Sequence, residues 1–281
     1  MKLLVVGSGT MGTGIAQVAA ENGITVLLND TDFNRLQAAQ ANIDKLLDKK
    51  VQKGRLTEDG KKEALNRIFL INDLKVAARD ADFVIEAIFE NLEAKLNLFK
   101  EMETVLKPGT VIASNTSTIS ITKMAKELKQ PENLVGMHFF SPVPAMRLVE
   151  VIKGEKTSEA TLKAALEMAE KLGKTPIAVA DVPGFIVNRF MCLMYNEAAS
   201  LIEKGVCTAK DIDTAMKLGA NHPMGPLEIS DMAGVDIVLG ALESLYAASG
   251  DERYKPTQLI KDMVAQGKLG RKTGEGFYKH Q

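Results

Sequence analysis

The first thirty residues combine an apolar run, a glycine-rich turn, a helical stretch and a second apolar run that ends in an acid. Residues 2–6 have strand length, and the glycine turn at residues 7–12 follows them at once. An Ala-rich stretch then leads to the second run, residues 24–28, and to Asp30. This order of strand, turn, helix, strand and acid is the dinucleotide-binding fingerprint in its full context. The chain is therefore predicted to open with a βαβ unit that binds a dinucleotide.

Each glycine of this turn has its own predicted role. Gly7 permits the tight turn, Gly9 lets backbone amides approach a pyrophosphate, and Gly12 lets the helix pack against the strand. The helix N-terminus adds N–H groups and a partial positive charge for the phosphates. Asp30 falls where a carboxylate would bond the adenosine ribose hydroxyls and repel the 2′-phosphate of NADP, so NAD is the expected cofactor. The predicted cofactor contacts in the turn are Gly7, Gly9, Thr10, Met11 and Gly12.

Composition is typical of a soluble globular protein with two domains. The 281 residues are 46% hydrophobic and 25% charged, and the net charge is −1. Such a balance favours neither nucleic acid nor a membrane surface as a partner, and no apolar stretch approaches the roughly 20 residues of a membrane span. The first strand begins directly after Met1, so we expect no targeting segment and a cytoplasmic location. Cys192 and Cys207 lack metal-ligand spacing, which predicts reduced thiols and no metal site.

Strands alternate with helices as far as about residue 183, which predicts a doubly wound α/β sheet of the Rossmann type. The further predicted strands are residues 68–71, 83–85, 110–113, 134–137, 147–151 and 176–180, and the helices between them include 92–106 and 158–172. The later pattern is helical only, over about residues 185–204, 208–217, 225–230, 234–248 and 257–266. We therefore predict a dinucleotide-binding domain at 1–183 and an all-helical domain at 184–281.

The segment between the second and third predicted strands is much longer than a crossover connection between parallel strands requires. Residues 33–51 and 57–66 have helical patterns, so a helical hairpin insertion is predicted at about residues 32–66. Its tip is basic, and its cations form either a solvated face or a phosphate-binding surface. They are Lys45, Lys49, Lys50, Lys53 and Arg55.

A histidine and a glutamate on neighbouring predicted strands are the candidate catalytic pair. His138 ends one strand, and Glu150 lies between valines on the next, where an unpaired carboxylate is costly to bury. Adjacent strands would bring Glu150 to the His138 ring, where it would fix the tautomer and stabilise the imidazolium. Such a pair can take a proton from an alcohol while hydride leaves the same carbon. Of the other two histidines, His222 is expected to be structural and His280 to be solvated.

Several polar residues follow predicted strand ends and are expected to converge on one cleft. In a doubly wound sheet, ligands bind beyond the carboxyl ends of the strands, where Asp30, Glu90 and residues 115–117 fall. Ser117 can donate a hydrogen bond to a hydroxyl or ketone oxygen of a substrate. Asn188 can bond the same oxygen, or the histidine, from the far side of the cleft.

Six motifs, taken together and in this order, resemble the short-chain L-3-hydroxyacyl-CoA dehydrogenases, most closely the bacterial 3-hydroxybutyryl-CoA dehydrogenases. They span the whole chain. They are residues 7–12, Ser114-Asn115-Thr116-Ser117, His138-Phe139-Phe140-Ser141-Pro142, Val182-Pro183-Gly184-Phe185-Ile186-Val187-Asn188-Arg189, Pro223-Met224-Gly225-Pro226 and Gly274-Glu275-Gly276-Phe277-Tyr278.

The resemblance implies a function and a set of site residues. The implied reaction is the reversible NAD-linked oxidation of a short (S)-3-hydroxyacyl-CoA, such as 3-hydroxybutyryl-CoA, to the 3-ketoacyl-CoA, such as acetoacetyl-CoA. CoA carries phosphates that need cations, which gives the basic hairpin a purpose through Lys50 and Lys53. The implied catalytic dyad is His138 and Glu150, the implied substrate contacts are Ser117 and Asn188, and the implied cofactor contacts are Glu90, Lys95 and Asn115.

The resemblance also implies a homodimer formed through the helical C-terminal domain. Apolar residues occur around most of the first helix of that domain, which therefore needs partners on several sides. A twofold pairing would bury the excess, whereas the alternative is a monomer whose helices fold back on the α/β domain. The apolar residues of this helix are Ile186, Val187, Phe190, Met191, Leu193, Met194, Leu201 and Ile202.

Two other functions fit the same two-domain plan. Dehydrogenases of free 3-hydroxy acids resemble this chain but use a lysine on the C-terminal helix, where this chain has Asn188-Arg189. A non-catalytic NAD-binding protein, like the lens crystallins of this family, would be marked by the loss of His138 or Glu150, and both are present.

Overall fold

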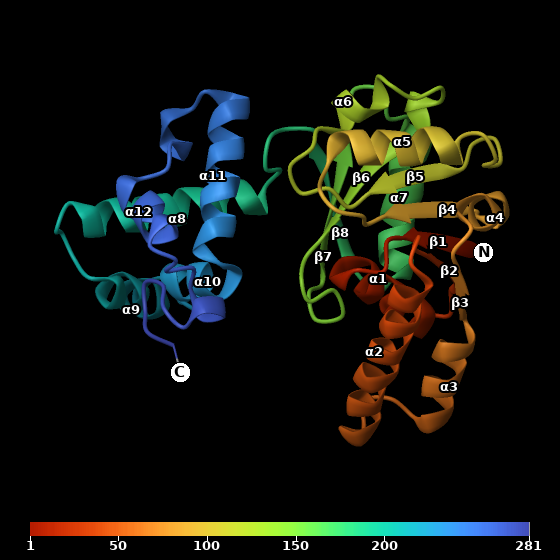
Figure 1. The fold of residues 1–281 in the computed structure, drawn as a ribbon, viewed down its shortest axis with the longest axis horizontal. Coiled ribbons are helices and arrows are strands. Elements are labelled where there is room, and N and C mark those ends of the chain that lie inside the picture. The colour runs from red at the N-terminus through yellow and green to blue at the C-terminus, as the bar shows by residue number, and fades with distance from the viewer. Residues whose placement is uncertain (281) are drawn as a thin grey trace. The chain divides into compact units, whose positions relative to one another are not determined.

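The computed structural model describes residues 1–280 and divides into two units, Met1–Val182 and a second from Pro183 onward (Figure 1). Eight strands of the first unit form one sheet in the order β3-β2-β1-β4-β5-β6-β7-β8. Their bounds are β1 (Lys2–Val6), β2 (Thr25–Asn29), β3 (Ile68–Ile71), β4 (Phe83–Glu86), β5 (Val111–Ser114), β6 (Leu134–Phe139), β7 (Leu148–Lys153) and β8 (Thr175–Ala180).

Among the strands that the structure describes, every neighbouring pair is parallel except β6 with β7. The chain runs outward from β1 to β3 and then returns to β4 on the other side of β1. In sheets of this kind the point of reversal, here the carboxyl ends of β1 and β4, is the usual place for a ligand. The predicted doubly wound α/β sheet is confirmed.

Both faces of the sheet are covered by helices, which explains why its inner strands are mostly apolar. Leu3, Val5 and their neighbours share one core with α1, α2 and α7, whereas Figure 1 shows α5 and α6 along the other face. The helices of the first unit are α1 (Thr10–Glu21), α2 (Phe33–Gln52), α3 (Glu58–Asn66), α4 (Leu74–Asp80), α5 (Leu92–Met102), α6 (Ile121–Ala125) and α7 (Glu159–Lys171), with a 3₁₀ turn at Pro131–Asn133.

Two short helices, α4 and α6, are missing from the predicted elements. Each begins at a polar cap, because the Asp73 carboxylate accepts from the Val76 amide (3.1 Å) and the Ser120 hydroxyl accepts from the Lys123 amide (3.1 Å). Such caps are sequence signals for a helix start. The helices have only seven and five residues, so they are too short to show a 3.6-residue repeat.

The predicted helical hairpin is present as α2 and α3. Leu36, Ile43 and Leu47 are buried on the inner side of α2. Thr57 caps α3 by accepting from the Gly60 amide at 3.0 Å. The hairpin is also joined by ion pairs, since the Lys61 ammonium of α3 contacts two aspartates of α2, Asp44 and Asp48.

The second unit is mainly helical, as predicted, and its helices are α8 (Val187–Glu203), α9 (Ala209–Gly219), α10 (Pro226–Ala233), α11 (Val235–Ser249) and α12 (Gln258–Ala265), with 3₁₀ turns at Glu252–Tyr254 and Arg271–Thr273. Its core includes Tyr195, Leu242 and Tyr254. Within residues 1–280 no single helix has the length and apolar composition of a membrane span. The α10–α11 pair meets that measure jointly and is bent by 99°.

Two buried carboxylates of the second unit bind its C-terminal segment. Asp231 accepts from the Phe277 and Tyr278 amides, both at 2.9 Å, and lies 2.7 Å from His280 Nε2. Asp213 accepts from the Tyr278 hydroxyl at 2.6 Å. The expectation that His280 is solvated is therefore wrong: its side chain is only 20% exposed, because Asp231 lies within the core and needs donors.

Candidate active site

The glycine turn between β1 and α1 is shaped for close approach by a ligand. A Cβ on Gly12 would lie 1.7 Å from the Gly7 carbonyl oxygen, and a Cβ on Gly7 would lie 2.6 Å from the Ala87 carbonyl oxygen. At Gly9, by contrast, no described atom lies within 4 Å of that position. Gly9 is the N-cap of α1, and no side chain within residues 1–280 caps the helix. The open space in front of these amides fits a dinucleotide pyrophosphate.

Asp30, which directly follows β2, lies beside the glycine turn and is hydrogen-bonded to it. Its Oδ2 accepts from the Ser8 amide at 2.9 Å and from the Ser8 hydroxyl at 2.8 Å, and its Oδ1 accepts from the Asp32 amide at 3.2 Å. Burial favours the neutral acid, but these hydrogen bonds and the Arg35 charge together hold the pKa of Asp30 below its usual range. Asp30 is therefore an anion at neutral pH, beside the glycine turn.

His138 and Glu150 face each other directly across the antiparallel β6–β7 pair. His138 Nδ1 lies 2.8 Å from Glu150 Oε2, and their side chains are 6% and 0% exposed. Because a carboxylate only accepts, the proton of the neutral ring is assigned to Nδ1, which leaves Nε2 as the basic nitrogen. The Phe140 ring packs on the imidazole, with centroids 4.6 Å apart.

Asn115 links the end of β5 to the end of β6 next to this pair. Its amide N–H donates to the Glu86 carbonyl at 2.8 Å, and its side-chain Oδ1 accepts from the Phe139 amide at 2.9 Å. Asn115 therefore holds the backbone that follows His138. The structure thus brings Asn115, predicted as a cofactor contact, close to the candidate dyad.

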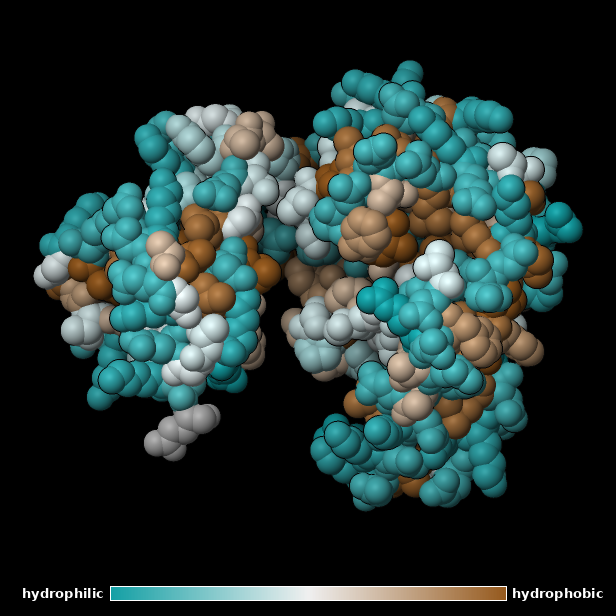
Figure 2. Space-filling model, in the orientation of Figure 1, coloured by the Kyte–Doolittle hydropathy of each residue, from teal (hydrophilic) through white to brown (hydrophobic). Residues whose placement is uncertain are grey.

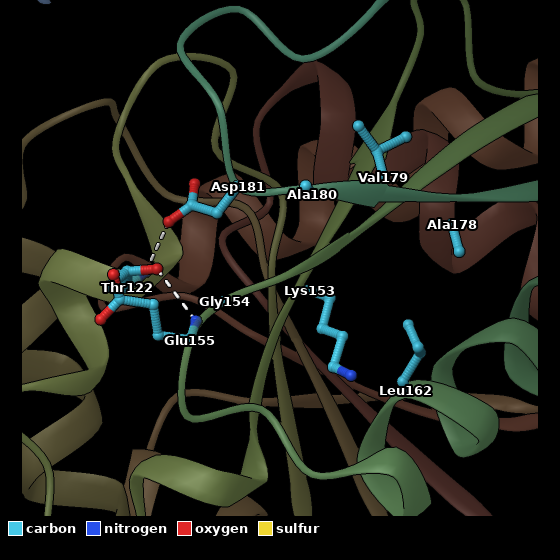
Figure 3. A pocket seen from close by; sticks show the side chains of 9 residues that line it. All are labelled: Thr122, Lys153, Gly154, Glu155, Leu162, Ala178, Val179, Ala180 and Asp181. Carbon is cyan, nitrogen blue, oxygen red and sulfur yellow. Dashed lines mark hydrogen bonds between the residues drawn. The ribbon is translucent and has the colours of Figure 1, made fainter.

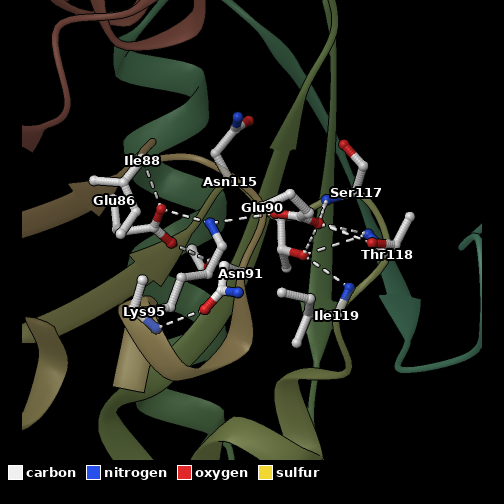
Figure 4. A network of polar contacts seen from close by, with 12 residues as sticks. Glu86, Ile88, Glu90, Asn91, Lys95, Asn115, Ser117, Thr118 and Ile119 are labelled. Atoms are coloured by element: carbon white, nitrogen blue, oxygen red, sulfur yellow. Dashed lines mark hydrogen bonds and ion pairs between the residues drawn. The ribbon is translucent and has the colours of Figure 1, made fainter. Parts of the chain in front are cut away.

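The segment of residues 115–119, called here the Ser117 loop, is bound by Glu90 (Figure 4). Glu90 Oε1 accepts from the Ser117 and Thr118 amides at 2.9 and 3.0 Å and from the Thr118 and Thr116 hydroxyls at 3.0 and 2.5 Å. Its Oε2 lies 3.3 Å from the Lys95 ammonium. Burial raises the pKa of Glu90, but these hydrogen bonds and the Lys95 charge outweigh it and lower the pKa.

Lys95, predicted as a cofactor contact, is 1% exposed, and its ammonium lies between two carboxylates of the protein. The second is Glu86, 2.6 Å away and fully buried. Glu86 is a site residue that the sequence analysis missed. The signal that singled out Glu150, an acid on an apolar buried strand, applies equally to Glu86 at the end of β4.

The remaining predicted substrate residues are on other elements of the chain. Lys53 is exposed at the C-cap of α2, whereas Lys50 on the same helix is paired with Glu21 of α1 at 2.5 Å. Asn188 is the second residue of α8 and belongs to the second unit.

A separate cavity of about 480 Å³ lies beside the edge strand β8 (Figure 3). At one end Thr122 is joined to Asp181 and to the Glu155 amide, at 2.7 and 3.1 Å. Lys153 and Leu162 line the other end. None of the predicted site residues is among those that line this cavity, and no sequence motif predicted it.

Models of two protein domains match nearly the whole chain. Residues 2–182 match the NAD-binding domain of 3-hydroxyacyl-CoA dehydrogenase, and residues 184–280 match the C-terminal domain of 3-hydroxyacyl-CoA dehydrogenase. The chain belongs to the 3-hydroxyacyl-CoA dehydrogenase family. The resemblance seen in the sequence is thereby confirmed, and so is NAD as the cofactor.

Individual members of the 3-hydroxyacyl-CoA dehydrogenase family align over the full length. The chain is 47% identical to a probable 3-hydroxybutyryl-CoA dehydrogenase of Deinococcus radiodurans, covering 100% of both chains. It is 42% identical to a 3-hydroxybutyryl-CoA dehydrogenase of Clostridioides difficile, covering 100% of this chain and 99% of that one. The crystal structure of (S)-3-hydroxybutyryl-CoA dehydrogenase PaaH1 from Ralstonia eutropha superposes with a TM-score of 0.97 at 43% identity, covering 100% and 99% of the two chains.

The Asp30 geometry predicts how strongly this dehydrogenase discriminates between cofactors. We expect the wild type to bind NADH more tightly than NADPH, and Asp30→Ala to narrow that difference at least about tenfold, because the anion that repels a 2′-phosphate is removed. Dissociation constants from NADH and NADPH fluorescence measure the effect. Asp32→Asn is the matched control, since Asp32 caps α2. A wild type that prefers NADPH would contradict the argument and make Arg35 the relevant residue.

Proposed function

We propose that this protein catalyses the reversible oxidation of a short (S)-3-hydroxyacyl-CoA, with 3-hydroxybutyryl-CoA as the model substrate, to the 3-ketoacyl-CoA. The observation that carries the proposal is the buried His138–Glu150 pair, with its 2.8 Å contact, at the end of β6. The names of the aligned relatives support the four-carbon substrate.

In this proposal each residue has a separate task. Bound NAD supplies the hydride chemistry. His138 Nε2 takes the hydroxyl proton in oxidation and returns it in reduction, while Glu150 orients the ring and stabilises its charged form. Ser117 and Asn188 bind the reacting oxygen. The family resemblance supports the part given to Asn188.

The chain's own residues argue against the two alternatives. A dehydrogenase of free 3-hydroxy acids would have a lysine at the start of α8, where Asn188 and Arg189 stand. A non-catalytic NAD-binding protein would have no need to keep a buried imidazole and carboxylate in contact. Turnover of acetoacetyl-CoA with NADH distinguishes all three functions.

Replacing His138 tests the proposed chemistry. We expect His138→Ala to lower kcat for acetoacetyl-CoA reduction at least about 100-fold, the lower range for a positioned acid–base. NADH affinity and the melting temperature are measured alongside, and NADH affinity is expected to hold. His222→Ala in the second unit is the matched control and is expected to keep its kcat. A His138→Ala enzyme with near-normal kcat would remove this residue from the mechanism.

The basic hairpin is the proposed site for the nucleotide phosphates of CoA. Its two candidate lysines, Lys50 and Lys53, differ in their surroundings. Lys50 is neutralised by Glu21, whereas Lys53 is exposed. We expect Lys53→Ala to raise KM for acetoacetyl-CoA several-fold while KM for a pantetheine thioester, which lacks those phosphates, stays the same. Lys50→Ala is expected to have a smaller effect, and Lys62→Ala, an exposed lysine of α3 outside the basic tip, is the control. Equal losses with both substrates would show that the lysines act elsewhere.

We also propose that the protein is a homodimer that pairs through its helical unit. Several large apolar side chains of this unit are exposed, and Figure 2 shows apolar surface among its hydrophilic side chains. A twofold contact would bury such residues. The most exposed are Phe190 (69%), Val206 (64%), Leu218 (84%), Met232 (52%) and Ile237 (60%).

Light scattering at micromolar concentration measures the assembly. We expect a mass near twice the 30.5 kDa of one chain. Phe190→Ser is expected to shift the mass toward the monomer, because it places a polar group in the proposed contact. A wild-type mass of one chain would reject the dimer.

A further inference from the structure

The turn that precedes α8 has a strained backbone. Phe185 has a φ of +51° and is buried. A bulky residue rarely adopts a positive φ, and such a conformation persists only where the surrounding structure holds it. Asn188, assigned above to the reacting oxygen, follows in the first turn of α8. The position of Asn188 therefore depends on what fixes this turn.

Arg189 binds the turn through both its side chain and its backbone. Its Nη1 donates to the Pro183 carbonyl at 3.1 Å, and its backbone N–H donates to the Gly184 carbonyl at 3.3 Å. A Cβ on Gly184 would lie 3.3 Å from Arg189 Cγ and 2.6 Å from Leu245 Cδ2, so the turn packs closely against this side chain and against α11. Arg189 thus joins the first turn of α8 to the two residues that lead into the strained position.

The Arg189 guanidinium also lies over an aromatic ring. Its Cζ is 5.5 Å from the centroid of the Tyr254 ring, within the range of a cation–π contact. Tyr254 is 1% exposed and belongs to the core of the second unit. The ring is therefore a fixed surface against which the planar guanidinium is oriented.

A second residue of α8 holds the segment that carries Tyr254. The Asn196 Nδ2 donates to the two backbone carbonyls on either side of Tyr254, at 3.0 and 2.9 Å, and its Oδ1 accepts from the Thr257 amide at 3.0 Å. Asn196 lies two turns after Arg189 on the same face of the helix. Tyr254 is thus bound to α8 at one point and supports Arg189 at another, close to the start of the helix.

We propose that Arg189 is a positioning residue for Asn188 and that the Tyr254 ring fixes the orientation of its guanidinium. The proposal deepens the function given above and rests on it, since Asn188 is there assigned to the reacting oxygen. Loss of the guanidinium releases the Pro183 carbonyl and displaces the start of α8, and Asn188 with it. The glycine turn belongs to the first unit and is left as it is.

A double-mutant cycle on Arg189 and Asn188 tests this, because residues that act as a unit are not additive. We expect Asn188→Ala to lower kcat for acetoacetyl-CoA reduction about 100-fold, as for loss of a donor to a reacting oxygen. Arg189→Ala is expected to lower kcat about tenfold, since a misplacement of about 1 Å costs up to about 100-fold. In the Asn188→Ala background the same Arg189 change is expected to cost less than about twofold, because the amide that it positions is gone.

Conservative variants separate the planar guanidinium from its charge. Arg189→Lys keeps the charge but loses the group that stacks on the ring, so its kcat is expected to lie between those of Arg189→Ala and the wild type. Tyr254→Phe keeps the ring face and is expected to keep kcat within about twofold, whereas Tyr254→Leu removes that face and is expected to lower kcat about fivefold. Arg253→Ala removes a neighbouring arginine whose side chain is 69% exposed, and is expected to leave kcat unchanged.

Two measurements distinguish positioning from a loss of stability. NADH dissociation constants are expected to stay within about twofold in Arg189→Ala, because the predicted cofactor residues lie in the first unit. Partial unfolding would lower the active fraction, so kcat would then fall by the same factor in both backgrounds of the cycle. Arg189→Lys takes the place of the alanine variant in the cycle if the latter does not fold.

The outcomes distinguish this proposal from the proposed function. Losses of kcat that multiply to about 1,000-fold in the double variant would overturn the positioning role and leave the proposed function intact. A kcat of Arg189→Ala within about twofold of wild type would overturn it as well. A near-normal kcat in Asn188→Ala would overturn the inference and the task given to Asn188, but not the chemistry of His138. A wild type that does not reduce acetoacetyl-CoA would overturn both proposals.

Discussion

The contact between His138 and Glu150 depends on the change of strand direction between β6 and β7. Cross-strand neighbours in an antiparallel pair stand side by side on the same face, so a register of His138 opposite Glu150 places imidazole and carboxylate within hydrogen-bond distance. Glu150 is fully buried there, so its carboxylate needs hydrogen-bond partners, and the His138 ring is one of them. The fold and the pair therefore constrain each other, because the strand register that completes the sheet is also the one that satisfies the buried acid.

The other acids at the carboxyl edge of the sheet are also paired with hydrogen-bond donors. Asp30 is satisfied by Ser8, Glu86 by Lys95 and Ser114, and Glu90 by the Ser117 loop. Each of these carboxylates is thus bound by a neighbouring strand end or turn as well as by residues close to it in the sequence. The loops that end successive strands are joined into one polar layer, and the apolar sheet beneath provides a rigid base for it.

The features that could be predicted from the sequence are those that depend on residues close together in the chain. The glycine turn, the acid after β2 and the apolar strands follow local rules, and the pairing of Glu150 follows from the cost of burying it. The position of His280 could not be predicted in this way. Its partner Asp231 precedes it by 49 residues. Lys50 likewise meets Glu21 across 29 residues. Composition and periodicity describe residues that are close together in the chain. They therefore do not show that a charged side chain is neutralised by a partner far away in the sequence.

The binding of the C-terminal segment by Asp213 and Asp231 has a consequence for synthesis. Both acids are 1% exposed and lie on α9 and α10, yet part of their hydrogen bonding comes from Phe277, Tyr278 and His280. While the chain emerges from a ribosome, these helices are complete well before their last donors exist. The helical unit thus reaches its final packing only after residue 280 has left the exit tunnel. The rate of translation therefore limits how early this unit can complete its folding.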